Sequence, residues 1–281
     1  MDLINNIYAL IAIVVLGAVF LFHCYFALNQ RRFIFLPSKH IENTPEIFDM
    51  DYKESILTHS NGDQIYSWSI WAKNTEPKRD IIFFHGNKGN MGSRLETYKM
   101  LCHELGFRVW TLDYRGYGKS SSFASQHHIE DDLVLFYQHL KTQLSVDELK
   151  NIPIYGRSLG GGVACLFCEI HNPKKLILEA TFSSVVDVTQ RKYPFLLGVK
   201  TLLKNQFIST DVTKNLKCPI LISHSPSDQV IPYASGQKLF ELTHGKPKEF
   251  FELKGEHSLG WKQSSKTYVP KLKKFLEIAD S

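Results

Sequence analysis

A serine lies at the centre of a Gly-x-Ser-x-Gly pattern formed by Gly156, Ser158 and Gly160. A short apolar run that favours a strand precedes the pattern, and a run that suits a helix, residues 163–167, follows it. A serine at so sharp a turn adopts unfavourable backbone angles, and the flanking glycines remove side chains that would clash there. The pattern alone also arises by chance or in a glycine-rich connection. Partners elsewhere in the chain decide whether Ser158 is a nucleophile.

Two residues further along the chain can activate this serine. A reactive serine needs a base to take its proton and a carboxylate to orient that base. Asp228 follows an apolar strand at residues 220–224, and His257 follows another strand at residues 249–253. The order serine, acid, histidine is the one expected when a Gly-x-Ser-x-Gly turn carries the nucleophile. We therefore expect Ser158 as nucleophile, His257 as base and Asp228 as the orienting acid.

Two other carboxylates also follow predicted strands. Glu179 ends the strand that we expect at residues 175–178, a position where some hydrolases carry the acid. It is the alternative to Asp228, which we favour because its strand-to-loop context fits better. Asp113 ends the strand at residues 108–113 and precedes the serine in the chain. We assign it the structural role of bracing the turn at residues 114–118.

Hydrogen-bond donors for a developing oxyanion are predicted in a separate loop. An apolar strand, residues 81–84, runs into the sequence His-Gly-Asn-Lys-Gly-Asn at residues 85–90, where glycines let main-chain NH groups approach a ligand. Such donors stabilise the charge that develops on a carbonyl oxygen during acyl transfer. We expect the backbone NH groups of Asn87 and of Leu159, the residue after the serine, to form this oxyanion hole.

At these residues the chain resembles the α/β-hydrolase superfamily, and within it the membrane-anchored branch of Bem46-like proteins with their ABHD13-type and ABHD17-type relatives. The similarity spans about residues 31–277, and its motifs are residues 85–90, 113–120, 156–161, 227–228 and 255–257. It implies a mostly parallel sheet with helices on both faces and the catalytic apparatus named above. One departure is that Ser258 and Leu259 follow His257, where the family commonly has Asn-Asp.

The order of strands and helices predicts one α/β-hydrolase domain at residues 51–281. Strands at residues 52–58 and 64–72 should pair across Asn61-Gly62, a turn dipeptide. Helices are expected at about residues 92–105, 127–144 and 264–278. Residues 181–217 mix apolar side chains with Lys and Arg, and we expect a small helical cap there. The alternative, in which these apolar groups only pack on the sheet, stays open.

The N-terminal segment is uncharged from residue 3 to residue 30, and residues 7–28 are almost wholly apolar. As a helix this segment is long enough to cross about 30 Å of hydrocarbon. We expect a transmembrane anchor at residues 1–30, with His23 near the membrane interface, and a membrane-proximal linker at residues 31–50 that is extended from Phe33 to Pro37. A cleavable signal peptide is the alternative, but the segment lacks a basic start and a small-x-small cleavage site.

Charge and cysteine content set further limits. Arg31, Arg32 and Lys39 follow the apolar segment, so the positive-inside rule favours a single-pass protein with a cytoplasmic hydrolase domain. The net charge of +5 comes from scattered residues, which does not indicate nucleic-acid binding. The five cysteines, an odd number, suit buried thiols, and Cys165 and Cys168 lie at helical spacing in an apolar run.

No metal or organic cofactor is implied by the sequence. His127 and His128 lie close to Asp131 and Asp132, but these residues open a predicted helix, where acidic side chains favour the positive end of the helix dipole. We expect a membrane-anchored serine hydrolase that cleaves carboxylic ester or thioester bonds of lipid-like or acylated substrates through an acyl-enzyme. A serine peptidase of the same fold and a non-catalytic, membrane-tethered binding module are the alternatives.

Overall fold

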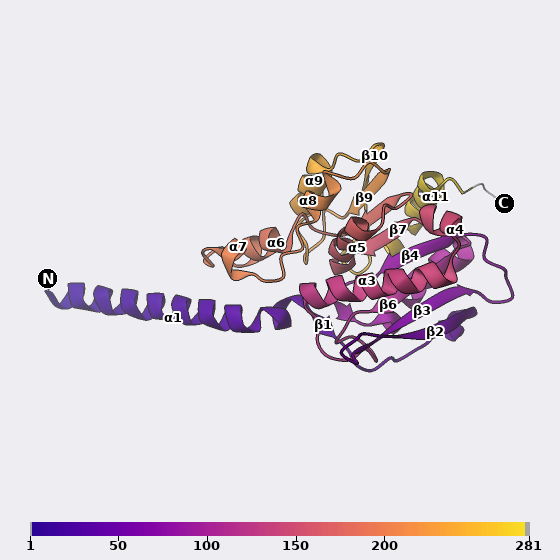
Figure 1. The fold of residues 1–281 in the computed structure, drawn as a ribbon. Coiled ribbons are helices and arrows are strands. Elements are labelled where there is room, and N and C mark those ends of the chain that lie inside the picture. Colours follow the sequence, from indigo (N-terminus) through magenta and orange to yellow (C-terminus); the bar gives the residue numbers. More distant parts are fainter. Residues whose placement is uncertain (1, 279–281) are drawn as a thin grey trace.

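An eight-stranded sheet organises the computed structural model, which describes residues 2–278 (Figure 1). The strands from β10 to β6 are parallel, and β3 and β2 are antiparallel to their neighbours. This confirms the predicted mostly parallel sheet. The strand order is β10 (Lys248–Glu252), β9 (Ile220–His224), β8 (Leu176–Glu179), β7 (Ile154–Arg157), β4 (Asp80–Phe84), β6 (Arg108–Asp113), β3 (Gln64–Ala72) and β2 (Met50–Thr58).

The central strands are apolar on both faces because helices cover the sheet on each side. In β4, Ile82 and Phe84 join one core while Ile81 and Phe83 join the other, as the two-residue period of a strand requires. The helices that contribute to the first core are α3 (Gln126–Gln143), α4 (Val146–Lys150), α5 (Leu159–Ile170) and α9 (Tyr233–Leu242). Those contributing to the second are α2 (Leu95–Lys99), the π-helical η3 (Met100–Glu104), α10 (Gly260–Gln263) and α11 (Ser265–Leu276).

The predicted hairpin is present as β2 and β3, with Leu57 opposite Ile65. Gly62 in its turn has a φ of +89°, which glycine adopts without strain. The helix expected at residues 92–105 consists of three short consecutive pieces. The 3₁₀ turn η2 (Met91–Arg94) is followed by α2 and then by η3. Helix α3 covers nearly all of the span predicted for it.

The N-terminal helix α1 (Asp2–Ile34) is longer than the sequence indicated. Phe33 and Ile34 are helical, so the expected extended linker from Phe33 is wrong for those two residues. The helix continues because its last turns are packed on the domain, where Phe26, Gln30 and Ile34 are buried. The chain then forms the short strand β1 (Leu36–Pro37), which pairs in parallel with β5 (Lys88–Gly89), and the 3₁₀ turn η1 (Pro45–Phe48).

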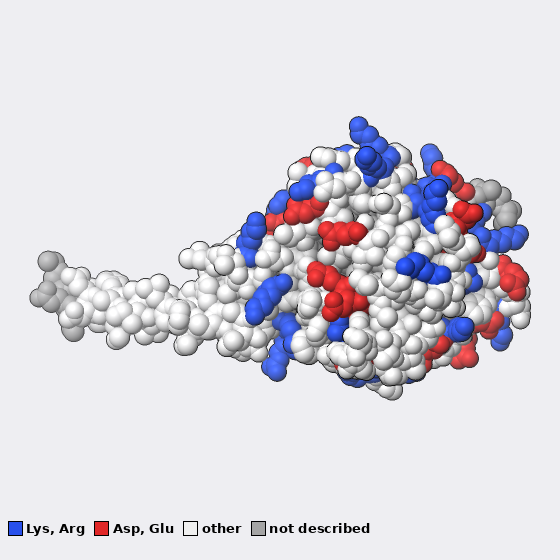
Figure 2. Space-filling model, viewed as in Figure 1, with Lys and Arg blue, Asp and Glu red and all other residues white. Residues whose placement is uncertain are grey.

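The first two thirds of α1 project away from the domain (Figure 1). Side chains there are exposed and apolar, and residues 4–34 have the length and composition of a membrane span. Figure 2 shows no Lys, Arg, Asp or Glu along the projecting part, and Lys and Arg side chains where the helix reaches the domain.

The segment between β8 and β9 forms a small helical cap from α6 (Val185–Lys192), α7 (Val199–Leu202) and α8 (Ser209–Thr213). The end of α1 packs against this cap. The Phe22 and Phe195 rings are 5.2 Å apart, and the Leu197 NH donates to His23 Nε2 at 3.0 Å. His23, which we expected only to lie near the membrane interface, therefore contacts the cap directly.

Candidate active site

Ser158 occupies the sharp turn between β7 and α5. Its φ of 55° and ψ of −124° are unfavourable for a residue with a side chain. Glycine is required at position 160 because a Cβ there would collide with the carbonyl oxygen of Phe84 on the neighbouring strand. The Ser158 NH donates to the carbonyl oxygen of Glu179 at 2.9 Å. These contacts hold the serine at the carboxyl end of β7.

The structure brings Ser158, His257 and Asp228 into one hydrogen-bonded chain. His257 Nε2 lies 2.9 Å from Ser158 Oγ, and His257 Nδ1 lies 2.7 Å from Asp228 Oδ2. The serine and the aspartate are 7% and 8% exposed, so water has little access to them. With its proton on Nδ1, the imidazole can take the serine proton at Nε2 while the carboxylate holds the ring in place.

Asp228 is fixed by more groups than the sequence suggested. Its Oδ1 accepts from the NH groups of Val230 and Ile231 at 2.9 and 2.8 Å. His224 Nε2 lies 3.3 Å from Oδ2. Burial by itself would raise the pKa of Asp228, but hydrogen bonds with His224 and His257 outweigh it and hold the pKa well below its usual value. The carboxylate therefore stays ionised at neutral pH.

Glu179, the alternative acid, is fully buried and engaged elsewhere. Its Oε1 accepts from Arg157 Nε at 2.9 Å, and its Oε2 accepts from the Tyr155 hydroxyl. Arg157 in turn donates from Nη2 to the carbonyl oxygen of His257 at 2.8 Å. Glu179 thus holds Arg157, and Arg157 holds the His257 loop. Sequence reasoning missed this role of Arg157, because the motif leaves the residue before the serine unspecified and says nothing about where its side chain points.

The His257 loop is held by local contacts, although this chain lacks the Asn-Asp that commonly follows the histidine in the family. The Ser225 hydroxyl donates to the carbonyl oxygen of Gly255, and the Lys254 NH donates to Ser264 Oγ at 2.7 Å. Gly255 has a φ of +88°, and a Cβ there would collide with the Gln263 side chain. Together with Arg157, these contacts anchor both sides of His257.

The peptide between Gly86 and Asn87 lies beside the serine. A Cβ on Gly86 would be only 3.2 Å from Ser158 Cβ. His85 Nδ1 donates to the Gly86 carbonyl oxygen at 2.8 Å, and in a trans peptide the NH of the next residue points the opposite way. This contact fixes the direction of the Asn87 NH. Leu159 is the first residue of α5, so its NH is one of the donors left free at a helix start.

Asp113 lies beneath this loop as well as beside the turn that follows it. Its Oδ1 accepts from the Met91 NH at 2.7 Å and is 3.2 Å from His85 Nε2, with His85 and Asp113 both fully buried. A Cβ on Gly118 would collide with its Oδ2. Asp113 therefore packs against the turn that we expected it to brace and also lies in contact with His85 at the start of the loop at residues 85–87.

Two cavities meet at Ser158. One, of about 360 Å³, has the basic side chains of Lys88, Arg94 and Arg157 in its wall beside His257. Burial and the charge of Arg157 lower the pKa of Arg94, whose Nη2 donates to the Lys88 carbonyl oxygen. The other cavity, of about 200 Å³, is mainly apolar, and α1, the cap and Leu159 line it. The serine therefore lies between a basic compartment and an apolar one.

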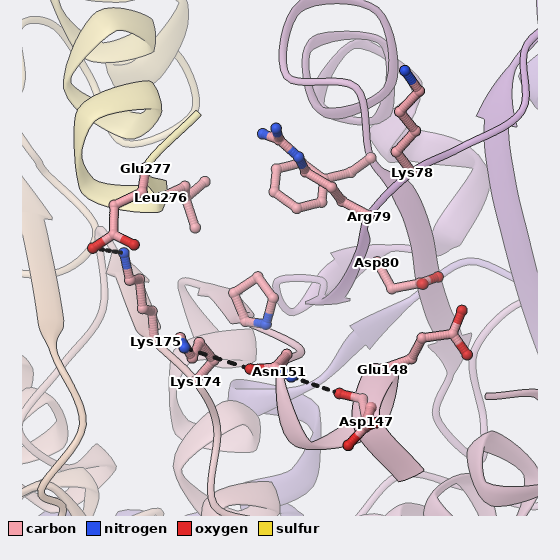
Figure 3. A pocket seen from close by; sticks show the side chains of 12 residues that line it. Lys78, Arg79, Asp80, Asp147, Glu148, Asn151, Lys174, Lys175, Leu276 and Glu277 are labelled. Atoms are coloured by element: carbon pink, nitrogen blue, oxygen red, sulfur yellow. Dashed lines mark hydrogen bonds and ion pairs between the residues drawn. The ribbon is translucent and has the colours of Figure 1, made fainter. Parts of the chain in front are cut away.

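A third cavity, of about 390 Å³, is shown in Figure 3 and lies away from the serine. Asp80 and Lys175 in its wall come at the starts of β4 and β8, so it is at the amino ends of the parallel strands. Three of its charged side chains form ion pairs, since Lys175 Nζ lies 3.0 Å from Glu277 Oε1 and Asp80 pairs with Arg108. We do not assign it to the site.

The residues that could suggest metal binding have other partners. Asp132 accepts from Arg115 Nε at 2.7 Å and lies 2.8 Å from His59 Nε2, while His128 Nδ1 is 2.8 Å from the Phe123 carbonyl oxygen. Across residues 2–278, no group of three or more His, Cys, Asp or Glu side chains is placed to hold a metal ion. Cys165 and Cys168 are free, buried thiols in α5.

Curated relatives share most of this chain. It is 29% identical over 271 residues to the Alpha/beta hydrolase domain-containing protein WAV2 of Arabidopsis thaliana, covering 88% of this chain and 87% of the relative. Protein bem46 of Schizosaccharomyces pombe is 28% identical over 212 residues, or 74% and 71% of the two chains. Lysophosphatidylserine lipase ABHD12 of Danio rerio is 33% identical over 181 residues, 58% of this chain but only 46% of the relative.

Solved structures and a family model agree with this similarity. The Pyrococcus furiosus esterase Pf2001 superposes with a TM-score of 0.69 at 17% identity, covering 87% of this chain and 97% of the esterase, which shows a shared fold. The family model described as "Serine aminopeptidase, S33" matches residues 75–218, just over half of the chain. The chain therefore belongs to this family of α/β-hydrolases, and its relatives include the Bem46-like proteins.

Proposed function

We propose that the protein is a membrane-anchored serine hydrolase that cleaves carboxylic esters or thioesters through an acyl-enzyme on Ser158. The observation that carries the proposal is the continuous hydrogen-bonded chain from Ser158 through His257 to Asp228. A serine in a strained turn with a base and a buried carboxylate in line has the arrangement required of an activated nucleophile.

The reaction follows from the positions of these groups. Ser158 Oγ attacks the carbonyl carbon while its proton passes to His257 Nε2, and the carbonyl oxygen takes up the negative charge. The NH groups of Asn87 and Leu159 donate to that oxygen. When the carbon–oxygen or carbon–sulfur bond breaks, His257 returns the proton to the departing alcohol or thiol. Water then attacks the acyl-enzyme, gives its proton to His257, and releases the acid and free Ser158.

The surroundings of the serine favour an amphiphilic ester. ABHD12 is named a lysophosphatidylserine lipase, and Pf2001 is named an esterase. In this chain the basic cavity would receive an anionic leaving group, because Arg94 lies in it with no carboxylate partner among the described residues and its Nε has no hydrogen-bond partner. A desolvated arginine with free donors binds phosphate or carboxylate groups well. We therefore propose a lipid ester, or an acyl thioester on a membrane-bound protein, as substrate.

The family description also names an aminopeptidase, and the charge of the site argues against that activity here. An aminopeptidase has to hold the positively charged amino end of a peptide close to the nucleophile. The basic cavity contains Lys88 and Arg94 against the one carboxylate of Glu256, while the charge of Arg157 is paired with Glu179. This excess of positive charge would repel an ammonium group. A non-catalytic binding role would not require a serine with unfavourable backbone angles or a histidine hydrogen-bonded to it.

We further propose that α1 crosses the bilayer and that the hydrolase domain is cytoplasmic. Arg31 stacks on the Phe123 ring at 3.7 Å, and Lys39 Nζ donates to the Ser120 carbonyl oxygen at 2.6 Å, so both cations lie on the domain side of the helix. We expect the protein to stay in the membrane pellet after alkaline carbonate extraction. Digestion of the hydrolase domain by protease added outside intact cells would contradict the orientation.

The experiment that tests the catalytic proposal compares ester and amide turnover by three full-length proteins. Wild type should hydrolyse p-nitrophenyl esters much faster than the matching p-nitroanilides. Ser158→Ala should lose ester hydrolysis by roughly three orders of magnitude or more, because only binding and oxyanion stabilisation remain. Ser69→Ala is the matched control, since Ser69 is also 7% exposed and lies in β3. Faster amide turnover would favour a peptidase, and full activity of Ser158→Ala would end the proposal.

A further inference from the structure

The apolar cavity beside Ser158 has one wall made by the N-terminal helix. Phe26, Phe33 and Ile34 of α1 line it on one side, and Val188 and Tyr193 of the cap line it on the other. Ser158, Asn87 and Leu159 lie in the same cavity, so the apolar space is continuous with the proposed nucleophile and its oxyanion donors. The helix is therefore part of the site and more than an attachment to the membrane.

The end of α1 is held against the cap by specific contacts. Phe26 is 1% exposed, and its ring lies 5.9 Å from that of Tyr193, while the Phe33 and Tyr193 rings are 6.3 Å apart. Gln30 is also buried, and its side chain donates to the Leu202 carbonyl oxygen and accepts from the Lys204 NH at 2.7 Å. A flexible tether would make no such contacts, so the wall formed by α1 is fixed.

The position of the cavity relative to a bilayer follows from the free length of α1. Contacts between α1 and the cap begin at Phe22, which leaves residues 4–21 projecting. At about 1.5 Å per residue this part spans roughly 27 Å, close to the thickness of a hydrocarbon core. The cap beside Phe22 exposes Phe195 by 47% and Leu197 by 77%. In a bilayer crossed by residues 4–21, these two side chains would lie at the membrane surface, and Phe195 would adjoin Tyr193 of the cavity wall.

We infer that this cavity binds the acyl chain of the substrate, which enters from the adjoining leaflet between α1 and the cap. The inference rests on the proposed ester hydrolysis at Ser158. It adds where the acyl chain of the substrate lies and which element of the protein determines the acyl-chain length that is accepted. The cavity volume of about 200 Å³ is below the roughly 300–1,000 Å³ of sites that enclose a whole ligand. Only the chain near the carbonyl is enclosed, and the polar leaving group occupies the basic cavity on the other side of Ser158.

The test fills the cavity without touching the catalytic groups. Full-length wild type and variants are assayed in mixed micelles with p-nitrophenyl acetate and p-nitrophenyl dodecanoate, and the ratio of their kcat/KM values is compared. Val188→Trp should lower the dodecanoate-to-acetate ratio by roughly tenfold or more, because pocket volume discriminates substrates on this scale. Val134→Trp introduces the same residue on α3, where Val134 is 48% exposed, and should leave the ratio unchanged.

A second variant tests the part of the cavity wall that α1 forms. It also keeps the proposal testable if Val188→Trp does not fold. Phe33 is 36% exposed, so Phe33→Ala should fold, and it should lower the ratio by roughly threefold or more. Labelling by a small fluorophosphonate checks that each variant keeps a reactive serine. If labelled Val188→Trp and Phe33→Ala both keep the wild-type ratio, the acyl-chain site is refuted while ester hydrolysis stands. If wild type cleaves neither ester, the proposed function itself fails.

Discussion

At the scale of single residues, the site depends on which carboxylate reaches the imidazole. Asp228 lies 2.7 Å from His257 Nδ1, whereas Glu179 is 2.9 Å from Arg157 Nε. Both carboxylates are connected to His257, one through its ring and the other through the carbonyl oxygen held by Arg157. We therefore expect their substitution to have different consequences.

Asp228→Asn should reduce kcat by about 10⁴, because an amide cannot fix the Nδ1-protonated tautomer or stabilise the imidazolium. Glu179→Gln should act mainly on stability, since it leaves the buried Arg157 without its counter-charge, which costs about 3–5 kcal/mol. Urea unfolding and ester kinetics on the same samples separate the two effects. A 10⁴-fold loss of kcat in Glu179→Gln, with Asp228→Asn nearly active, would transfer the role of acid to Glu179.

The proximity of the three proposed catalytic residues was predictable because the chemistry of such residues and their order along the chain are both constrained. Ser158, Asp228 and His257 each follow an apolar strand in a parallel sheet, so their loops had to lie at one edge. His85, His224 and Arg157 were not predicted as supports. Their roles depend on where side chains point after folding, and neither spacing nor composition carries that information.

At the scale of elements, the contact between α1 and the cap could not be predicted from sequence patterns. A helix that is apolar all round has no polar stripe to show which side packs on protein and which on lipid. The cap segment mixes apolar and basic residues, and this pattern did not show which of its side chains pack on other parts of the protein. Only the fold places residues 22–34 beside residues 193–205, which lie far away in the chain. Removing residues 1–30 would thus delete Phe26 from the cavity wall together with the proposed anchor.

Gln30 allows this contact to be tested by stability. Its side chain is 4% exposed and joins α1 to Leu202 and Lys204 of the cap. Gln30→Ala leaves these buried backbone groups unpaired, which should destabilise the protein by about 1–3 kcal/mol. The neighbouring Asn29→Ala is the control, since the Asn29 amide donates to Tyr25 within the same helix. Equal unfolding midpoints for the two variants in detergent would show that α1 does not dock on the cap.

At the scale of the whole molecule, the proposed site lies on the side of the domain that α1 reaches, which would face a membrane crossed by that helix. The loops after β4, β7, β9 and β10 carry the proposed catalytic groups at the carboxyl ends of the strands, near the point where α1 reaches the domain. The cavity of Figure 3 lies at the opposite ends of the strands. On the face shown in Figure 2, Lys and Arg side chains lie where α1 reaches the domain, and there they would face anionic headgroups. A substrate held in the leaflet would thus reach Ser158 without crossing the solvent.

The central claim is that Ser158 is a nucleophile activated by His257, and the pH dependence of its labelling tests this most directly. The rate of fluorophosphonate modification is measured across the acid range, and the adduct is mapped by peptide mass spectrometry. We predict an adduct on Ser158 and a rate that falls with decreasing pH as one proton is taken up. The depressed pKa of Asp228 keeps that carboxylate ionised over this range, so its own protonation does not account for the loss of rate. An adduct on another residue, or a labelling rate at Ser158 that does not change with pH, would contradict the account.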